Sequence, residues 1–244
     1  MHPVLFQIGS LEVRSYFVAI CLAFLIAAWL AARRASALGL TASQIAVLGS
    51  ATLVVGVAGA RLGFVLDSWK SFQGDPAKIF RLWDGGVGFY AGAALGLLAV
   101  AWVLHLYGKP VLLVLDRTVR YLVLSVAIAR VGCFLNGCCA GVPTDLPWGV
   151  MFVSEIVRRH PTQIYESAGM LLLFFLLKRL ERRNLPAGTV LFTSFLYYGV
   201  MRFGLEFIRE DARPGLMRLS SAQWISLALV VWGALELKDR LHRR

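Results

Sequence analysis

Long apolar runs separated by short polar connections make up most of the chain. An α-helix needs about 20 residues to cross roughly 30 Å of hydrocarbon, and seven runs approach or exceed this length. The pattern predicts an all-α, polytopic integral membrane protein with about seven transmembrane helices and a single domain over residues 1–244. The first run has no basic leader or small-residue cleavage site, so we expect it to be retained. The runs are 15–32, 44–66, 86–107, 111–131, 162–178, 186–207 and 221–238.

Composition supports a membrane protein, and the positions of the basic residues explain the high net charge. The chain is 58% hydrophobic and 16% charged, with a mean hydropathy of +0.69. A net charge of +11 is compatible with nucleic-acid binding, but the basic residues fall mostly in short connections, where they orient helices. We therefore expect membrane lipid and no nucleic acid as a partner. The segments "KRLERR" and "KDRLHRR" favour a cytoplasmic C-terminus, and an odd number of helices then places the N-terminus outside.

Eight ionisable residues fall within or at the edges of the apolar runs, where each costs roughly 2.5–3.5 kcal/mol at the bilayer centre. Internal pairing explains some of them, and long arginines near helix ends can extend to the surface. Five arginines nevertheless face only three acids, which favours an anionic ligand such as a phospholipid phosphate. These residues are Arg61, Asp116, Arg117, Arg120, Arg130, Glu166, Arg202 and Glu206.

The sixth run carries a polar stripe of Tyr198, Arg202, Glu206 and Arg209. At 100° per residue these side chains fall within about 80° of one another on one helical face. Such a face must turn toward a protein interior or a wet cavity. Two interpretations stay open, a salt-bridge ladder between helices or a ligand site in which Glu206 holds the arginines.

The third run begins "GGVGFYAGAALG". Gly88, Gly92 and Gly96 repeat every four residues, a spacing that lets helix backbones approach closely. Gly86, beside Gly85 and Asp84, indicates a turn that a ligand can approach. The hydroxyl of Tyr90, one turn inside the helix, would be available to a cavity.

The segment "RRHPTQIYES" opens the fifth run. Pro161 suits a first helical turn, and Gln163 and Glu166 share a face of the helix. His160 is a candidate base, although a lone histidine before proline is more often a capping or surface residue.

The stretch "RVGCFLNGCCAG", residues 130–141, holds three of the four cysteines. A zinc site would need a second ligand pair that the chain lacks, so no metal is expected. A Cys133 disulfide with Cys138 or Cys139 is possible, whereas a catalytic thiol would need a base nearby. The glycines instead predict tight turns whose N–H groups line an anion site below Arg130. The cysteines would then be small packing residues or a local staple.

Together "GGVGFYAG", "RVGCFLNGCCAG", "HPTQIYE" and "YYGVMRFGLEFIRED", in this order and spacing, resemble the prolipoprotein diacylglyceryl transferase family. The resemblance runs from the first predicted helix to the last. It implies a seven-helix enzyme of the bacterial inner membrane with an outer N-terminus and no cofactor. The implied partners are phosphatidylglycerol and prolipoprotein signal peptides, whose lipobox cysteine thiol receives the diacylglyceryl group while glycerol-1-phosphate is released.

The resemblance also implies roles for individual residues. Arg130 matches the arginine that contacts the phosphatidylglycerol headgroup. Arg202 matches an essential arginine of the sixth helix, with Glu206 and Arg209 as its companions. Substrate contacts are expected from Asn136, Gly141, Arg209, Tyr198, Gly86, Gln163, Glu166 and His160. The catalytic set comprises Arg130, Arg202, Glu206 and Tyr90.

Two positions depart from the family pattern. Tyr90 stands where the best-known members have a histidine proposed as the base, and Cys133 stands where they have an asparagine. A divergent branch with the same activity is the first hypothesis. The alternatives are a paralogue that uses the lipid pocket for a different acceptor, and a non-enzymatic phospholipid-binding or transport protein.

Overall fold

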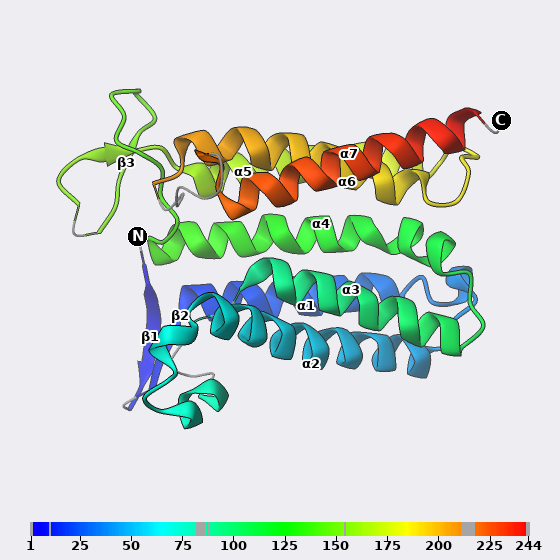
Figure 1. Ribbon diagram of the computed structural model, residues 1–244, viewed down its shortest axis with the longest axis horizontal. Coiled ribbons are helices and arrows are strands. Elements are labelled where there is room, and N and C mark those ends of the chain that lie inside the picture. Colours follow the sequence, from blue (N-terminus) through cyan, green and yellow to red (C-terminus); the bar gives the residue numbers. More distant parts are fainter. Residues whose placement is uncertain are drawn as a thin grey trace. The chain divides into compact units, whose positions relative to one another are not determined.

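A computed structural model describes residues 2–9, 11–81, 86, 88–153, 155–210 and 218–242. The described part of the chain contains seven α-helices, short 3-10 turns and two small two-stranded sheets (Figure 1). It forms two compact units, one made of Met1–Leu30 with Leu115–Arg244 and the other of Ala31–Val114.

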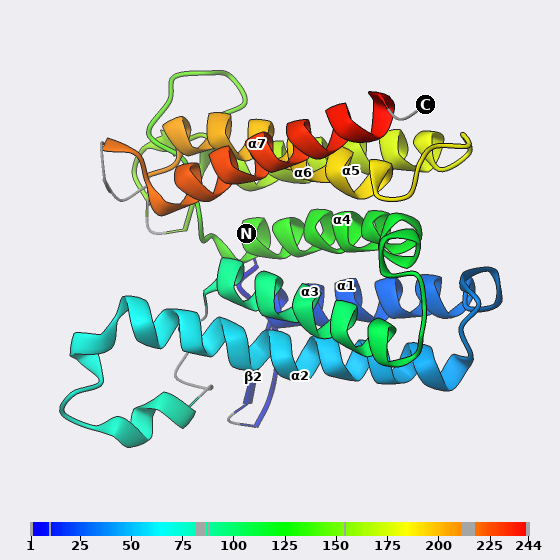
Figure 2. The same cartoon turned by 45° about the vertical axis from the view of Figure 1, so that its right-hand side comes forward.

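The first unit begins with a hairpin and contains most of the long helices. The hairpin strands pair antiparallel, and helices α5, α6 and α7 lie side by side in both views (Figure 1, Figure 2). The elements, two of which run into the second unit, are β1 (Val4–Ile8), β2 (Leu11–Arg14), α1 (Ser15–Ala32), α4 (Val111–Asn136), β3 (Val150–Met151), β4 (Arg158–Arg159), α5 (Thr162–Leu180), α6 (Thr189–Leu205), η5 (Glu206–Ile208) and α7 (Ser221–His242).

The second unit consists of two long helices and short 3-10 turns. Its elements are η1 (Ser36–Leu38), α2 (Ala42–Asp67), η2 (Trp69–Ser71), η3 (Pro76–Phe80) and α3 (Phe89–Leu106). A buried apolar cluster joins the start of α2 to the end of α3; among its members are Leu40, Leu48 and Leu104.

The predicted helices are all present, and local sequence explains where several begin. Thr41 and Gln44 form a capping box at the start of α2, and Ser220 and Gln223 exchange the same pair of bonds before α7. Both motifs satisfy N–H groups that a helix start leaves without partners. The ends agree with the prediction to within a few residues except for α4, which continues to Asn136 instead of ending at 131.

Helices α2 and α3 pack through glycines, as the four-residue repeat predicts. A Cβ on Gly92 would lie 2.8 Å from both the Ala60 Cβ and the Gly56 carbonyl oxygen, and a Cβ on Gly63 would lie 2.4 Å from the Ala91 Cβ. Gly96 differs, because its nearest neighbours would be at an ordinary 3.7 Å. Close packing therefore requires Gly92 but leaves room for a side chain at position 96.

Glycines also set the contacts inside the first unit. A Cβ on Gly199 of α6 would lie 2.7 Å from the Ser226 carbonyl oxygen of α7, and one on Gly169 of α5 would lie 2.3 Å from the Met201 sulfur of α6. Small residues permit this approach where lipid supplies no hydrophobic driving force between helices.

Three of the described helices, α1, α2 and α3, are long and apolar enough by length and composition to cross a membrane. Their surfaces expose large apolar side chains such as Phe17, Val54 and Trp102. Outward-facing apolar side chains of this kind suit a helix surrounded by lipid.

Candidate functional site

The candidate site lies in the first unit, where four helices begin or end near one another. Helix α4 ends here and α5 begins, while α6 ends and α7 begins. The loop that follows α4 is tied to the end of α6, because Gly141 and Arg209 form an antiparallel bridge and the Val142 N–H donates to the Ile208 carbonyl oxygen at 2.9 Å. The N-terminal end of α5 is joined to the same loop by side-chain hydrogen bonds.

The end of α4 corrects the prediction that the helix stops at residue 131 of "RVGCFLNGCCAG". The segment is helical to Asn136 and then closes with Gly137 at φ 77°. The N–H of Gly137 donates to the Phe134 carbonyl oxygen and that of Cys138 to the Cys133 carbonyl oxygen, at 3.1 and 3.2 Å. This pair of bonds is a Schellman motif, for which glycine is the favoured residue at the left-handed position.

Gly132 is a packing residue and not the turn residue that we expected. It lies inside α4, where a Cβ would come within 2.3 Å of the Ala19 Cβ of α1. Gly141 is crowded by the loop itself, since a Cβ there would lie 2.5 Å from the Ile208 carbonyl oxygen and 2.7 Å from the His160 Cβ. Of the three glycines, only Gly137 supplies the predicted left-handed turn.

Half-buried Arg130 and buried Glu166 form an ion pair between α4 and α5. The Arg130 Nε lies 2.9 Å from the Glu166 Oε2, and the Glu166 side chain is only 1% exposed. The second carboxylate oxygen, Oε1, has no hydrogen-bond partner among the described residues, and neither has the side-chain oxygen of Gln163. The two acceptors stand one turn apart on α5, which matches the prediction that these residues share a face.

Arg202 and Glu206 form a second buried pair where α6 ends. The Arg202 Nη1 lies 2.5 Å from the Glu206 Oε2, and the Ser220 hydroxyl donates to the other carboxylate oxygen at 2.8 Å. The helix stops at Leu205, so Glu206 opens the η5 turn and Arg209 follows in extended conformation. Arg209 is also buried, at 8% exposed.

The charges expected to be in surplus are largely accounted for by these and other contacts. Arg120 pairs with Glu181 at 2.8 Å, and Arg117 is exposed. Asp116 accepts hydrogen bonds from the Gly188 and Leu191 N–H groups at the start of α6. Arg61, in the second unit, donates to the four carbonyl oxygens of Lys78, Ile79, Arg81 and Gly86.

Arg61, Arg117 and Arg120 are therefore not the surplus cations that we expected. The residues that support an anion site are Arg130, Arg202 and Arg209. These three cations reach the same helix ends, and two of them are already oriented by carboxylates. A carboxylate that fixes an arginine leaves the remaining N–H groups of its fork available for a planar or tetrahedral anion.

Side chains at the start of α5 hold the cysteine-rich loop by its backbone. The Gln163 Nε2 donates to the Cys138 carbonyl oxygen at 2.6 Å, and the Thr162 hydroxyl donates to the Cys139 carbonyl oxygen at 2.7 Å. Both polar side chains are at most 1% exposed. The loop is thus positioned by buried hydrogen bonds and not by a disulfide.

The three clustered cysteines are free thiols. They lie close enough to interact electrostatically with one another, and the positive charge of Arg209 acts on Cys139. In the described part of the chain no group of three or more His, Cys, Asp or Glu side chains has the arrangement of a metal site. The predicted disulfide staple is not formed in this structure.

Tyr16, at the start of α1, is a site residue that sequence reasoning missed. Its hydroxyl lies close enough to Arg130 and to the three clustered thiols to interact with them electrostatically. Its position in the sequence, where an apolar helix begins, gave no signal. Only the packing of α1 against α4, seen also in the bond from the Ser125 hydroxyl to the Ala23 carbonyl oxygen at 3.0 Å, brings it here.

His160 takes part in a surface network with two aromatic residues. Its Nδ1 lies 3.3 Å from the Tyr165 hydroxyl, which also accepts a 2.8 Å hydrogen bond from the Trp148 indole. The half-buried imidazole thus has a polar partner on the side of the loop. This geometry suits the structural interpretation of His160 better than the interpretation as a base.

Tyr90 and Gly86 belong to the second unit, whereas the ion pairs and the cysteine-rich loop belong to the first. Tyr90 packs edge-to-face against Phe89, with ring centroids 5.7 Å apart. Gly86 has φ 79°, as a turn residue should, and its carbonyl oxygen accepts from Arg61 at 3.0 Å. Asp84 and Gly85 lie outside the described residues.

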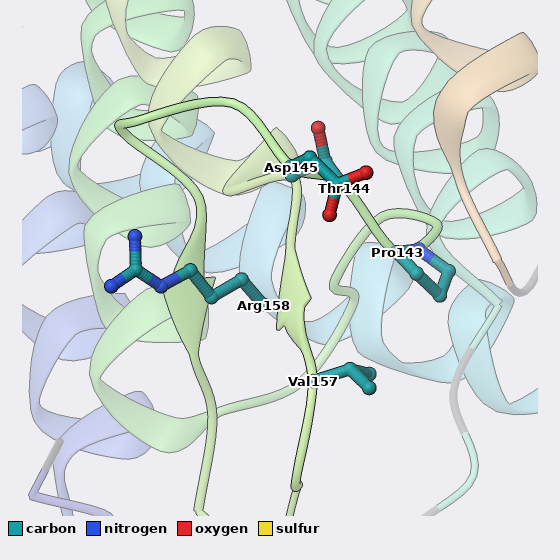
Figure 3. A pocket seen from close by; sticks show the side chains of 5 residues that line it. All are labelled: Pro143, Thr144, Asp145, Val157 and Arg158. Atoms are coloured by element: carbon teal, nitrogen blue, oxygen red, sulfur yellow. The ribbon is translucent and has the colours of Figure 1, made fainter.

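A cavity of about 430 Å³ lies in the loop between α4 and α5, and neither the Arg130–Glu166 pair nor the Arg202–Glu206 pair lines it. Figure 3 shows Val157 and Arg158 projecting to opposite sides of their strand, with Thr144 and Asp145 on the neighbouring segment. Pro143 completes the lining. Most of these side chains are exposed, and none belongs to the buried set of arginines and carboxylates.

Comparison with known proteins adds independent findings. The family model described as prolipoprotein diacylglyceryl transferase matches residues 3–237. A phosphatidylglycerol–prolipoprotein diacylglyceryl transferase of Aeromonas hydrophila is 34% identical over 243 residues, covering 96% of this chain and 89% of the relative. Relatives with the same name from Vibrio vulnificus and Mannheimia succiniciproducens are 35% and 33% identical, covering 96% and 99% of this chain and 89% and 94% of the relatives.

Proposed function

Because this chain belongs to the prolipoprotein diacylglyceryl transferase family, we propose that it transfers a diacylglyceryl group from phosphatidylglycerol to the thiol of the lipobox cysteine of a prolipoprotein. The proposed products are the thioether-linked lipoprotein precursor and glycerol-1-phosphate. The observation that carries the proposal is the pair of arginines, half-buried Arg130 and buried Arg202, each oriented by a buried carboxylate at one end of the first unit.

The reaction needs positive charge around the phosphate. The substrate thiol forms a C–S bond with the terminal glycerol carbon of the diacylglyceryl group, and the C–O bond from that carbon to the phosphate breaks with its electron pair on oxygen. The thiol proton passes to a base or to the released phosphate. Charge grows on the leaving phosphate as the bond breaks, so preoriented cations lower the barrier.

Arg130 and Arg202 are the groups that we assign to the phosphate. Each is held by one carboxylate, Glu166 or Glu206, which places the guanidinium before substrate arrives and limits the reorganisation needed during reaction. Arg209, at the end of η5, adds a third cation beside the loop. Tyr198, on α6, interacts electrostatically with Arg130 and completes the polar stripe.

The glycerol part of the headgroup needs hydrogen-bond acceptors, and α5 supplies two. The Glu166 Oε1 and the Gln163 Oε1 are buried without hydrogen-bond partners among the described residues, so hydroxyl groups of a substrate would satisfy them. We assign Asn136 and Gly141 to the same headgroup region, because they border the loop that these α5 side chains hold.

Activation of the substrate thiol is assigned mainly to the arginines. A thiol with a pKa near 8.5 is only a few per cent thiolate at neutral pH, and nearby positive charge increases that fraction. Tyr90 is proposed to position the thiol or the phosphate by a hydrogen bond. His160 remains a secondary candidate for the base, at a lower rank because of its contact with Tyr165.

The proposed setting is the bacterial inner membrane, crossed by all seven helices, with the N-terminus outside and the C-terminus in the cytoplasm. The apolar surfaces of α1, α2 and α3 and the clusters of Lys and Arg near the C-terminal end support this arrangement. The cysteine-rich loop after α4 would then face the outer side.

One reconstituted assay tests the activity. Purified protein in lipid nanodiscs is mixed with a lipobox peptide and phosphatidylglycerol, and mass spectrometry follows the diacylglyceryl adduct. We expect a thioether product with phosphatidylglycerol and none with a peptide whose lipobox cysteine is serine. Normal phosphatidylglycerol binding without any adduct would contradict the transferase assignment.

A further inference from the structure

The three thiols beside Arg209 are not used by the proposed reaction, in which the nucleophile comes from the substrate. Buried cysteines usually serve as small apolar residues. Here three thiols from one short segment lie close enough to interact electrostatically, at the end of the helix that carries Arg130. A cluster of free thiols can exchange with disulfides, which gives this segment a redox chemistry separate from the transferase reaction.

The fold at the end of α4 selects one pair from the three. In a Schellman motif the side chain two positions after the last helical residue packs against the side chain five positions earlier. Those positions are Cys138 and Cys133. Their backbones are joined by a 3.2 Å hydrogen bond, and the Cys138 sulfur lies 3.6 Å from the Cys133 carbonyl oxygen. The adjacent pair, Cys138 and Cys139, can be bridged only with strain.

Cys139 is the thiol best placed to react first. It lies in a left-handed conformation, φ 65°, which sets it apart from the helix end and beside Arg209. Hydrogen bonds from the Cys133 and Cys138 thiols, together with the positive charge of Arg209, lower the pKa of the Cys139 thiol. A thiolate is the species that attacks a disulfide.

We propose that this cluster is a reversible thiol–disulfide switch, in which Cys139 reacts with a small-molecule disulfide or a disulfide oxidoreductase and Cys133 and Cys138 end as the disulfide. The inference rests on the proposed transferase function only for its effect on turnover. The modification itself is a separate property of the three thiols.

The exchange is balanced in three steps. The Cys139 thiolate attacks the oxidant disulfide, forms a mixed disulfide and releases one thiol. Cys133 attacks the Cys139 sulfur and releases the second thiol of the oxidant. Cys138 then attacks the Cys133 sulfur and frees Cys139. In total two protein thiols lose two electrons and two protons, and one oxidant disulfide becomes two thiols.

The disulfide encloses Asn136 and Gly137, which lie between the bridged cysteines. In the reduced protein the Cys138 thiol is a hydrogen-bond partner of Asn136 and contacts the Cys133 carbonyl oxygen. A disulfide sulfur has no proton to donate, so oxidation removes the bond from the Cys138 thiol to the Cys133 carbonyl oxygen and fixes the end of α4 one turn after Arg130. We therefore expect oxidation to lower turnover by altering the headgroup region. In the proposed orientation the loop faces the oxidising side of the membrane.

The first measurement uses the full-length protein in nanodiscs, equilibrated in glutathione buffers of increasing glutathione disulfide content. Peptide mass spectrometry should find the loss of two hydrogens on a peptide that links Cys133 to Cys138. Turnover in the same samples should fall at least tenfold in step with the disulfide and recover with dithiothreitol. Absence of the disulfide, or a disulfide that leaves turnover unchanged, overturns the switch.

Variants separate the parts of the proposal. Cys138→Ser should keep the turnover of the reduced protein and lose the response to oxidant. Cys21→Ser, which alters the exposed cysteine of α1, is the matched control and should respond like the unaltered protein. Cys139→Ser should slow disulfide formation at least tenfold without removing it, and an unchanged rate contradicts the role of Cys139. If reduced protein shows no turnover, the transferase proposal fails while the disulfide measurement still decides the modification.

Discussion

At the residue scale, the main functional feature is an arginine held by a carboxylate, which occurs at Arg130 with Glu166 and at Arg202 with Glu206. A buried ion pair is costly to form, because both charges lose water, and removal of one partner leaves the other charge uncompensated. The same arrangement at Arg120 and Glu181, 2.8 Å apart and about as buried, has no assigned role in the reaction. It therefore provides an internal comparison.

Arg130→Ala and Arg202→Ala should each reduce kcat by about 100- to 1,000-fold, the loss typical of one electrostatic contact to a developing charge. Lysine at either position should restore little activity, since it lacks the bidentate fork. The measurement is adduct formation per folded protein, with folding checked by thermal unfolding. Arg120→Ala is the control, because it breaks an equivalent buried pair and should lower stability while kcat stays within severalfold of normal.

Tyr90→Phe should reduce turnover about ten- to a hundredfold, the scale of one hydrogen bond in a transition state. Tyr90→His should preserve or raise turnover, because imidazole can act as a base near neutral pH. The pH dependence of kcat in the unaltered protein and in Tyr90→Phe is the measurement. A loss beyond about a thousandfold, with disappearance of the acidic limb, would show that Tyr90 is itself the base.

At the element scale, single residues determine where helices end and how closely they pack, and Asp116 is one of them. Asp116 of α4 accepts from the Gly188 N–H at 2.6 Å and from the Leu191 N–H at 2.8 Å, so it caps a helix far from it in the sequence. Its negative charge also lies at the positive end of the α6 dipole. The sequence indicated only a costly charge at this position.

Asp116→Ala should lower the free energy of unfolding by about 1–3 kcal/mol, because the first N–H groups of α6 lose buried acceptors. Reversible unfolding in mixed micelles would measure this change. Turnover per folded protein should remain normal, since Asp116 lies at the opposite end of α4 from Arg130. A variant with normal stability would show that water or lipid replaces the cap.

Gly92→Ala should destabilise the helix pair α2–α3, whereas Gly96→Ala should not. The Cβ added at Gly92 would lie 2.8 Å from the Gly56 carbonyl oxygen and force the backbones apart, whereas the one at Gly96 would make ordinary contacts at 3.7 Å. Alanine also favours the helix by about 1 kcal/mol over glycine. Thermal unfolding should therefore show a lower Tm for Gly92→Ala and an equal or higher one for Gly96→Ala.

At the scale of the whole molecule, the seven α-helices of the described residues belong to two units of different character. The second unit consists mainly of α2 and α3 with their glycine contact, and its helices carry little charge. The first unit contains the ion pairs and the loop after α4. Because the Arg130–Glu166 and Arg202–Glu206 pairs lie at the same end of the first unit as Arg209, the reaction is assigned to one side of the membrane.

Labelling of single cysteines with a membrane-impermeant maleimide in intact cells tests that orientation. In a variant without the four natural cysteines, a cysteine at Ile156, which is 92% exposed, should react from outside. A cysteine at Arg183, in the connection between α5 and α6, should react only after the cells are opened. The reverse labelling pattern would contradict an outer N-terminus, and labelling of both positions in intact cells would contradict the predicted number of crossings between them.

The sequence by itself determined the helices and the identity of the candidate residues. Apolar runs predicted seven helices because each must bury or shield its own backbone hydrogen bonds, and capping residues such as Thr41 mark ends through contacts within four residues. The quoted motifs led to the family, which the comparisons confirm. All of these signals are local or depend on order along the chain.

Only the tertiary structure decided which charges meet. Arg61 binds backbone carbonyl oxygens, Asp116 caps α6, and Arg130 pairs with Glu166. The spacing of these residues along the chain does not predict which kind of partner each charge finds. The packing role of Gly132 and the position of Tyr16 likewise depend on the approach of α1 to α4. Pairing between helices depends on distance in space, and residues 36 positions apart, such as Arg130 and Glu166, carry no record of that distance in their local sequence.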